Sequence, residues 1–517
     1  MLVQCKKVEF ETRIGPPGNS ELTQALHHSN KPSMKPTLSF LLLMLCSSFC
    51  AASTVPYDLG KEEYEHDVIW SFDGCSTHRL MQNSGIPKVF NGNVYTVIIA
   101  PGLHPRVVKV PLDGSASRVE PLQRNPDYTI GDDGHQYFTL GIDSKGYVHV
   151  VGGMHNSKEI KHWRSVRPED ISEFVFASGK DGPSGNSFTY PFLTTDLKGT
   201  LFHHARITRN DKGCNARGLS VLDPESQTWS MIGADIPSKD GGLRNRPVTL
   251  WEDDTRAVTT TYSAPELRMV FDSKNRMHLA FGILNRTMEK DGKYSNTDVL
   301  YARSDDGGKT ITKSNGEPIK WPVRAEEGPH QGELAYSEPD GPPPWLDKGD
   351  LSLVTDWQNA PIISTTSHKS GRHVLRLEDG SWVPYGNDGI GELLGHDVRG
   401  VLSSRLNNGD ILRFWDPGNT RRVALPHRIH RIDAEYLRDT GDLIYTAPPA
   451  DKPITPTLLG LRFHSAARER ASRMARCTSA KACAASYFGL ANVGFGARRA
   501  LGPECNGRRA VRCIAAH

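Results

Sequence analysis

The chain has 517 residues, of which 37% are hydrophobic and 23% are charged, a composition typical of a soluble globular protein. This length allows one large all-β domain or two to three domains of average size. A net charge of only +3 gives no reason to expect nucleic acid as a partner, and the 48 glycines and 34 prolines favour many turns.

An apolar run near the N-terminus predicts export. SFLLLMLCSSFC (39–50) is followed by the small residues AAST, and Met34 is a second candidate for the start of translation. The run is too short to span a membrane but has the length of a signal-peptide core, although a buried strand is the alternative. We therefore interpret residues 1–52 as an N-terminal extension with a signal peptide, cleaved near 51–53. The mature protein is expected to be secreted, soluble and without a membrane partner.

Residues 55–450 show the pattern of strands and turns, with little helical periodicity. Apolar residues alternate or form runs of four to six bounded by Gly, Asp, Asn and Pro, which indicates an all-β fold. The clearest runs are VYTVIIA (94–100), YVHVVGG (147–153), RMHLAFGI (276–283), VLYARS (299–304) and DILRFW (410–415).

A weak internal repeat runs through these strands. A strand leads into Asp-x-x-Gly or Asp-x-x-Asn, which suits a tight hairpin, and a second strand follows. Its copies are 140–152, 192–205 and 269–282, with a looser one at 401–415. At roughly 50–60 residues per blade, about 400 residues predict a seven-bladed β-propeller. An incomplete last blade and a β-sandwich with long loops are the open alternatives.

Two histidines flank the first copy, GDDGHQYFTLGIDSKGYVHVVGGMHN (131–156). His135 precedes the first strand of the hairpin and His155 follows the second, so an antiparallel pair would make them neighbours. The next copy, SFTYPFLTTDLKGTLFHHARI (187–207), has Tyr190 and Arg206 in the corresponding places. An imidazole pair, a phenol and a fixed cation suit acid–base chemistry on an anionic substrate. The alternative is loop histidines bonded to backbone, a core tyrosine and a surface arginine.

Another stretch, YARSDDGGKTIT (301–312), matches the Asp-box turn S-x-D-x-G-x-T-W except that Ile311 replaces the tryptophan. Together with the two histidine- and tyrosine-flanked hairpins and CNARGLSVLDPESQTW (214–229), it resembles the BNR-repeat propellers that include ulvan lyases. The resemblance runs from about residue 60 to 430. It implies a seven-bladed propeller that cleaves a uronate-containing sulfated polysaccharide by β-elimination.

The resemblance also implies roles for particular residues. His135 and His155 match the paired active-site histidines, Tyr190 the catalytic tyrosine and Arg206 the arginine that neutralises the uronate carboxylate. Tyr262 is a weaker match to a further active-site tyrosine. We expect His135 to be the base and Tyr190 the acid, with His155 binding substrate or sharing the proton.

No cofactor is required for this chemistry, but relatives carry a structural zinc or calcium. The ligands of such an ion are not assigned; the candidates are His203, His204, His278, His373 and Cys214. We expect the protein to act as a monomer on an anionic polysaccharide.

Two other functions compete with elimination. A sialidase-type hydrolase would need a pair of carboxylates, for which Asp132 and Asp133 are available, or a tyrosine or glutamate nucleophile with an arginine triad. A propeller that binds carbohydrate without turnover could keep the same residues.

The cysteines limit the number of possible disulfides, and the composition changes near the C-terminus. The body contains only Cys75 and Cys214, so at most one disulfide could form there, and Asn285 begins an N-glycosylation sequon. Residues 451–517 are basic and carry four cysteines. We interpret them as a tail that is either disordered or an artefact of the gene model, with a small disulfide-stapled appendage as the alternative.

Overall fold

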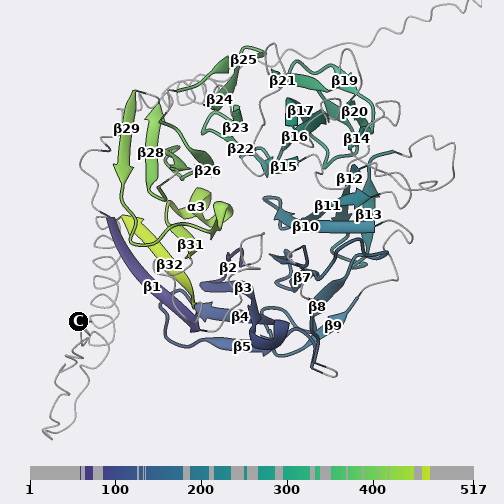
Figure 1. The fold of residues 1–517 in the computed structure, drawn as a ribbon, viewed down its shortest axis with the longest axis vertical. Helices are drawn as coiled ribbons and strands as arrows, with labels where there is room; N and C mark the ends of the chain where they lie inside the picture. The colour runs from purple at the N-terminus through teal and green to yellow at the C-terminus, as the bar shows by residue number, and fades with distance from the viewer. Residues whose placement is uncertain are drawn as a thin grey trace, which may run out of the picture. The chain divides into compact units, whose positions relative to one another are not determined.

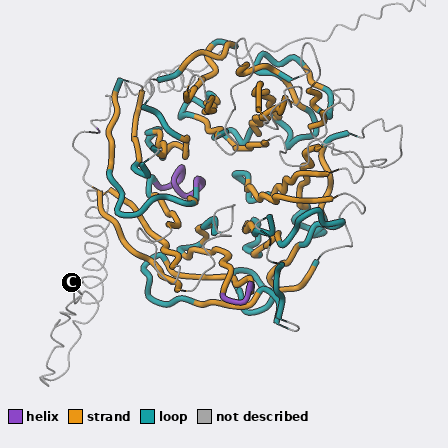
Figure 2. The backbone as a smooth tube through the Cα atoms, viewed as in Figure 1, coloured by secondary structure: helices purple, strands orange, loops and turns teal. Residues whose placement is uncertain are grey.

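Antiparallel strands, joined by turns and loops, are the main secondary structure of the described residues, as Figure 2 shows. The structure is a computed structural model. It describes residues 59, 64–73, 85–124, 127–131, 133, 135–177, 187–208, 215–234, 250–252, 266–285, 295–325, 332–337, 351–367, 371–386, 389–406, 408–416, 418–447 and 457–465. All of them belong to one compact unit that begins at Tyr57.

The strands form seven sheets, which are the blades of a β-propeller arranged in a ring (Figure 1). In chain order, the first three blades are β2 (Lys88–Phe90), β3 (Asn93–Ala100), β4 (His104–Pro111) and β5 (Arg118–Pro121); β6 (Phe138–Ile142), β7 (Val148–Gly152), β8 (His162–Ser165) and β9 (Phe174–Phe176); and β10 (Ser187–Thr195), β11 (Leu201–Thr208), β12 (Asn215–Leu222), β13 (Trp229–Ile232) and β14 (Leu250–Glu252). A short 3-10 turn, η2 (Pro101–Leu103), joins β3 to β4.

The remaining blades follow the same plan. They are β15 (Glu266–Phe271), β16 (Met277–Asn285), β17 (Ser295–Ser304), β18 (Ile311–Thr312), β19 (Pro318–Ile319) and β21 (Glu333–Ser337); β22 (Ser352–Thr355), β23 (Pro361–Ser367), β24 (Gly371–Glu378) and β25 (Ser381–Pro384); β26 (Glu392–His396), β27 (Leu402–Arg405), β28 (Ile411–Asp416) and β29 (Asn419–Val423); and β30 (Arg431–Ile432), β31 (Leu443–Ala447), β32 (Thr457–Ser465) and β1 (Tyr64–Asp73). One further strand, β20 (Val323–Ala325), pairs in parallel with β14. The all-β, seven-bladed fold predicted from the sequence is confirmed.

The last blade is complete, contrary to the incomplete blade considered above. β1, from the N-terminal side of the ring, pairs antiparallel with β32 along its whole length, from Tyr64 opposite Ser465 to Asp73 opposite Thr457. β32 in turn pairs with β31. The propeller therefore extends at least to residue 465, and the boundary expected at 450 is wrong. The pairing joins segments nearly 400 residues apart, so no local pattern in the sequence announces it. Residues 1–52 and 466–517 lie outside the described residues.

A repeated turn connects the first two strands in five of the blades. An aspartate accepts hydrogen bonds through one carboxylate oxygen from the backbone amides two and four residues later, and the fourth residue of the turn has a positive φ. The turn aspartates are Asp143, Asp196, Asp272, Asp356 and Asp397. Glycine or asparagine occupies the positive-φ position, since both tolerate that conformation.

These turns confirm three copies of the sequence repeat and correct the fourth. The looser copy at 401–415 spans β27 and β28, the second and third strands of their blade. The true equivalents in the last third of the ring are the turns at Asp356 and Asp397. An Asn-Gly turn also joins β27 to β28. The sequence pattern of this second hairpin therefore resembles that of the first hairpin in the other blades. The Asp box is confirmed as a structural turn between β17 and β18, where Asp306 accepts from the amide and hydroxyl of Thr310.

Apolar residues fill the space between neighbouring blades. Tyr95 and Val97 of β3 pack with Phe138 and Leu140 of β6 and with Trp163 of β8, all of them at most 1% exposed. Because each sheet buries both faces against its neighbours, the inner strands are fixed relative to one another. Side chains at the ends of adjacent inner strands are therefore held on a rigid rim.

A short helix replaces the aspartate turn in the last blade. α3 (Ala434–Thr440) links β30 to β31, and Asp433 caps it by accepting from the amides of Glu435 and Tyr436. Figure 1 shows α3 inside the ring of sheets. No helix among the described residues is long and apolar enough to cross a membrane.

Candidate active site

The two histidines that flank the β6–β7 hairpin lie against each other. The rings of His135 and His155 are stacked, with centroids 4.1 Å apart and an angle of 15° between their planes. The antiparallel pairing of β6 and β7 brings together the start of one strand and the end of the other. The adjacency expected from the hairpin is thus present in the structure. Both side chains are about one-third exposed.

Asp133 joins the two imidazoles through one carboxylate. Its Oδ1 accepts from the backbone amide of His135 at 3.0 Å and from Nδ1 of the same residue at 2.5 Å, and its Oδ2 contacts Nδ1 of His155. A carboxylate only accepts, so each Nδ1 carries a hydrogen and each neutral ring keeps a bare Nε2. Both imidazoles are therefore held as proton acceptors at Nε2.

The charge of Asp133 is strongly stabilised. Burial opposes its ionisation, but hydrogen bonds from the amide and ring of His135 and from the ring of His155 outweigh burial and lower the pKa of this carboxyl to about 2. Asp133 is thus a carboxylate throughout the neutral range. It can hold the imidazoles but cannot donate a proton there.

Tyr190 lies beside this pair, at a bulge in the next blade. The pairing of β10 with β11 is interrupted between Thr189 and Phe192, and Tyr190 itself has φ of 60°. This unusual conformation of a bulky residue turns it out of the regular alternation of β10. Its ring centroid lies 5.7 Å from that of His135, and Tyr137 stacks on its other side at 5.6 Å.

Arg206 completes the cluster from β11. Its guanidinium carbon lies 4.7 Å from the centre of the Tyr190 ring, and a terminal nitrogen donates to Oδ1 of Asn156 at 3.5 Å. The side chain is only 3% exposed, and its Nε has no hydrogen-bond partner among the described residues. A buried cation of this kind is poised to pair with an incoming anion.

Burial sets the protonation of the phenol and the guanidinium. It raises the pKa of Tyr190 above its ordinary value, and the positive charges of Arg206 and Arg217 offset only part of this increase. Tyr190 is thus a neutral phenol that can donate a proton at neutral pH. Burial also lowers the pKa of Arg206, with Tyr190 opposing the shift, but an arginine remains charged in the neutral range.

Three further arginines lie close to one another near Tyr137, the residue that stacks on Tyr190. Arg431, at the start of β30, lies near Arg405 and Arg268, and Tyr137 is close enough to affect its charge. Burial lowers the pKa of Arg431 to about 10, while the carboxylate of Glu392 opposes this shift. Arg405 is paired with Glu392, so these three arginines and one carboxylate leave a net positive charge near Tyr137.

Within the described part of the chain, one group of three side chains could hold a metal ion. The ligand atoms of Asp133, His135 and His155 lie within 4.8 Å of one another. Two imidazole nitrogens and a carboxylate suit a divalent transition metal. Each Nδ1, however, already donates to Asp133, so the group satisfies itself without an ion.

The histidines considered as structural ligands do not gather. His203 bonds Ser220, His204 stacks on Phe192, His278 lies between Asp272 and Tyr301, and His373 packs on Tyr336. Cys214, Tyr262 and Asp132 lie outside the described residues.

Sequence reasoning missed the bridging role of Asp133 and the arginines across the channel. Asp133 was considered only as a hydrolytic carboxylate. Its position two residues before His135 is the spacing at which an aspartate binds a nearby amide, which was the available signal. The sequence around Arg405 and Arg431 gave no signal of their position near the site, because the blades that carry them are far from it in the sequence.

The fold and this cluster define a β-propeller with a cationic, histidine- and tyrosine-containing site at one end of its strands. The description "BNR repeat-containing family member" matches residues 107–385. The chain belongs to this BNR-repeat family. No curated protein matches it at a significant level.

Solved structures with similar folds include carbohydrate-active enzymes. The polysaccharide lyase Uly1 is 12% identical, with a TM-score of 0.54 over 78% of this chain and 99% of that chain. An ulvan lyase bound to a GlcA(1-4)Rha3S saccharide is 14% identical, with a TM-score of 0.47 over 69% and 86%. An α-L-arabinanase of Penicillium chrysogenum is 11% identical, with a TM-score of 0.37 over 64% and 93%. At such identities the similarity to Uly1 concerns the fold alone.

Proposed function

We propose that the protein is a secreted polysaccharide lyase that cleaves a uronate-containing, ulvan-like sulfated polysaccharide by β-elimination. The observation that carries this proposal is the contact between the buried Arg206 guanidinium and the Tyr190 ring, next to the stacked His135 and His155. A cation, a phenol and a bare imidazole nitrogen are the groups that elimination from a uronate needs.

Elimination assigns a role to each group. The hydrogen on carbon 5 of a uronate is weakly acidic because the neighbouring carboxylate is already negative. Arg206 pairs with that carboxylate and stabilises the negative charge that develops as the hydrogen leaves. Nε2 of His135 takes the proton, the carbon 4–oxygen bond breaks, and a carbon 4–carbon 5 double bond forms. The phenol of Tyr190 then gives its proton to the departing oxygen.

His155 and Asp133 support the base. Asp133 keeps both Nε2 atoms bare and can balance one imidazolium after the proton has moved. His155, stacked on His135, is available to bind the substrate or share the proton. Each acid or base of this kind contributes on the order of 10²- to 10⁴-fold to the rate. No step in this scheme requires a metal or cofactor, and a structural zinc or calcium elsewhere remains a proposal.

Hydrolysis is less well supported by the same geometry. A glycosidase acid must be a protonated carboxyl near neutral pH, whereas the carboxyl of Asp133 has a pKa of about 2 and bonds two imidazoles. A binding protein without activity is the remaining alternative, because the cationic rim would also hold an anionic chain. A monomer would suffice for either role, since every group named here comes from one chain.

The test is to incubate the full-length protein with uronate-rich polysaccharides and follow ultraviolet absorbance. Elimination creates an unsaturated uronate that absorbs, while hydrolysis releases reducing ends without that absorbance. A rise in both signals with an ulvan-type polysaccharide supports the lyase. Reducing ends alone would identify a hydrolase, and tight binding with neither signal would identify a binding protein.

A further inference from the structure

A cavity of about 290 Å³ lies in the channel at the centre of the propeller. Inner strands β2, β10, β15, β22, β26 and β30, together with α3, line it. None of the four residues of the proposed active site belongs to its lining. We call this space the central cavity.

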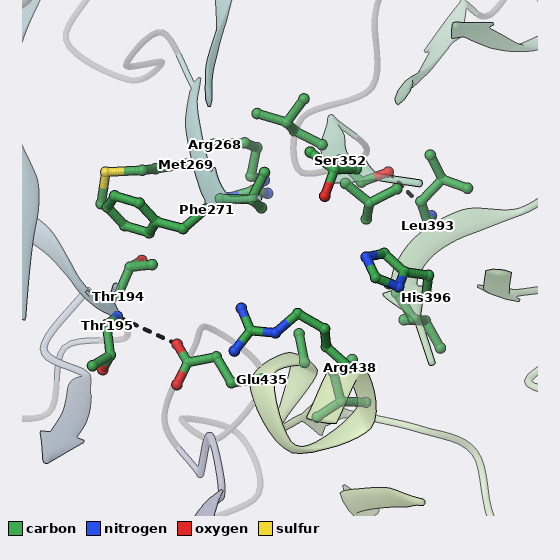
Figure 3. A pocket seen from close by; sticks show the side chains of 18 of the residues that line it. Thr194, Thr195, Arg268, Met269, Phe271, Ser352, Leu393, His396, Glu435 and Arg438 are labelled. Carbon is green, nitrogen blue, oxygen red and sulfur yellow. Dashed lines mark hydrogen bonds between the residues drawn. The ribbon is translucent and has the colours of Figure 1, made fainter. Parts of the chain in front are cut away.

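The walls of the central cavity combine apolar and polar side chains. Met269 and Phe271 from β15 and Leu393 from β26 supply apolar surface, and Figure 3 shows that the side chains of His396 and Arg438 project into the space between them. A concave pocket with an apolar wall and a few convergent polar groups is the usual form of a small-molecule site.

The carboxylates of the lining already have cationic partners. Glu435 lies 2.9 Å from the ammonium of Lys88 and accepts from the amide of Thr195 at 3.3 Å. Glu392 forms an ion pair with Arg405. The negative charge in the wall is thus neutralised within the wall itself.

Arg438 is in a different position. Its Nε donates to the exposed Asp439 at 2.8 Å, and its two terminal nitrogens have no hydrogen-bond partner among the described residues. The side chain is 21% exposed, and Figure 3 shows the guanidinium reaching toward the middle of the cavity. Two parallel donors in a plane match the two oxygens of a carboxylate.

His396 offers the complementary group. Its Nδ1 donates to the carbonyl oxygen of Asp397 at 2.9 Å, which fixes the hydrogen on that nitrogen. Nε2 of the neutral ring is then an acceptor, and it has no partner among the residues that the structure describes. An acceptor of this kind suits a hydroxyl group.

We propose that the central cavity binds a small hydroxylated carboxylate of monosaccharide size, with its carboxylate on Arg438 and a hydroxyl on His396. The volume lies at the lower end of the range for small-molecule pockets, which suits one sugar-acid ring. Arg268 adds a further cation to the lining. This site does not depend on the elimination reaction proposed above.

The experiment is calorimetric titration of the full-length protein with D-glucuronate, D-glucose and inorganic sulfate. Glucuronate should bind, glucose should bind at least tenfold more weakly, and Arg438→Gln should weaken glucuronate binding roughly ten- to hundredfold, the usual value of a charge-assisted hydrogen bond. Arg422→Gln is the matched control. Arg422 lies on the outer strand β29, is 59% exposed and forms an ion pair with Asp410. Arg438→Lys and His396→Ala, each expected to weaken binding several-fold, serve if Arg438→Gln lowers the unfolding temperature.

Arg206→Ala separates this cavity from the proposed active site. Glucuronate binding that survives Arg206→Ala and is lost in Arg438→Gln supports the proposal. The proposal is overturned if glucuronate does not bind, if the Arg438 variants bind it normally, or if Arg206→Ala alone abolishes binding. Sulfate binding as tight as glucuronate would overturn the assignment to a carboxylate.

Discussion

The imidazole rings of His135 and His155 stack at 4.1 Å because one hairpin separates them and one carboxylate holds both. The hairpin supplies the proximity, and Asp133 supplies the orientation. With both Nδ1 atoms engaged, the two Nε2 atoms are the basic positions of the pair. The protonation pattern of the proposed active site thus depends on the carboxylate of Asp133.

Replacing Asp133 with asparagine should therefore impair catalysis more than binding. The amide oxygen of Asn can accept from one Nδ1, but its NH2 group cannot accept from the other, so one imidazole loses its bare Nε2. We expect kcat to fall on the order of 10²-fold with KM changed only a few-fold. Nitrogen NMR of the two imidazoles should show the change of tautomer.

Asp127→Asn is the control for this change. Asp127 also lies beside a histidine, with its Oδ2 3.1 Å from Nδ1 of His104, but it is outside the proposed active site. It should leave kcat unchanged. An Asp133→Asn protein with wild-type tautomers and wild-type kcat would contradict the assigned role.

Removing the buried cation should abolish elimination. Arg206→Ala takes away the group that stabilises the negative charge on the uronate, so we expect the rate of double-bond formation to fall on the order of 10³-fold or more. Arg206→Lys should restore only a small part, because an ammonium cannot reproduce the planar pair of donors. Ultraviolet absorbance gives the rate, and a thermal unfolding midpoint shows whether the fold survives. Near-normal activity in Arg206→Ala would exclude the proposed mechanism.

Local sequence patterns were sufficient for many of the strands, three of the five aspartate turns and the histidine pair. A β-hairpin is a short-range structure, so residues at its two ends can be placed side by side from spacing alone. The bulge at Tyr190, the pairing of β1 with β32 and the position of α3 inside the ring of sheets depend on contacts between distant segments. No short window of the sequence contains that information. The central cavity was unpredictable for the same reason, since six inner strands and a helix must assemble to form it.

Acid should destabilise the protein through its buried imidazoles. Burial lowers the pKa of His203 to about 3, and it also lowers the pKa values of His149, His162, His204 and His278. These groups take up protons in the unfolded chain as the pH falls below about 6.5, but in the folded protein only at a lower pH. Folding stability should therefore fall as pH decreases below about 6.5, by about 1.4 kcal/mol per pH unit for each such histidine.

Thermal unfolding between pH 7.5 and 5 measures this slope. His203→Gln should make the dependence on pH shallower, because it removes one group that gains a proton on unfolding. His373→Gln, at a half-buried position on β24, is the control. A midpoint independent of pH over this interval would contradict the prediction.

The aspartate turns should differ in their contribution to the free energy of unfolding, depending on whether the aspartate also bonds a buried arginine. Asp397 accepts from the terminal nitrogens of Arg413 at 2.5 Å and Arg399 at 2.6 Å, and Arg413 is only 1% exposed. Asp397→Ala should cost about 3–5 kcal/mol of unfolding free energy, because it leaves a buried guanidinium without its anion. At the equivalent position the Asp196 carboxylate bonds the side-chain amide of Asn275 but no arginine among the described residues, so Asp196→Ala should cost only about 1 kcal/mol. Urea unfolding of both variants tests the difference, and equal losses would show that the ion pair is unimportant.

Because β32 pairs with β1 and closes the ring, the fold should depend on where the chain ends. A chain that ends after residue 450 lacks β32, so β1 and β31 lose their common partner and two sheet edges become unpaired. Unpaired edges associate with one another, so we expect this shortened protein to aggregate or to unfold at a much lower temperature. A chain that ends after residue 470 retains β32 and should fold like the full-length protein. Circular dichroism and size-exclusion chromatography of the two shortened proteins would decide, and a stable, monomeric 450-residue form would show that the ring holds without this pairing.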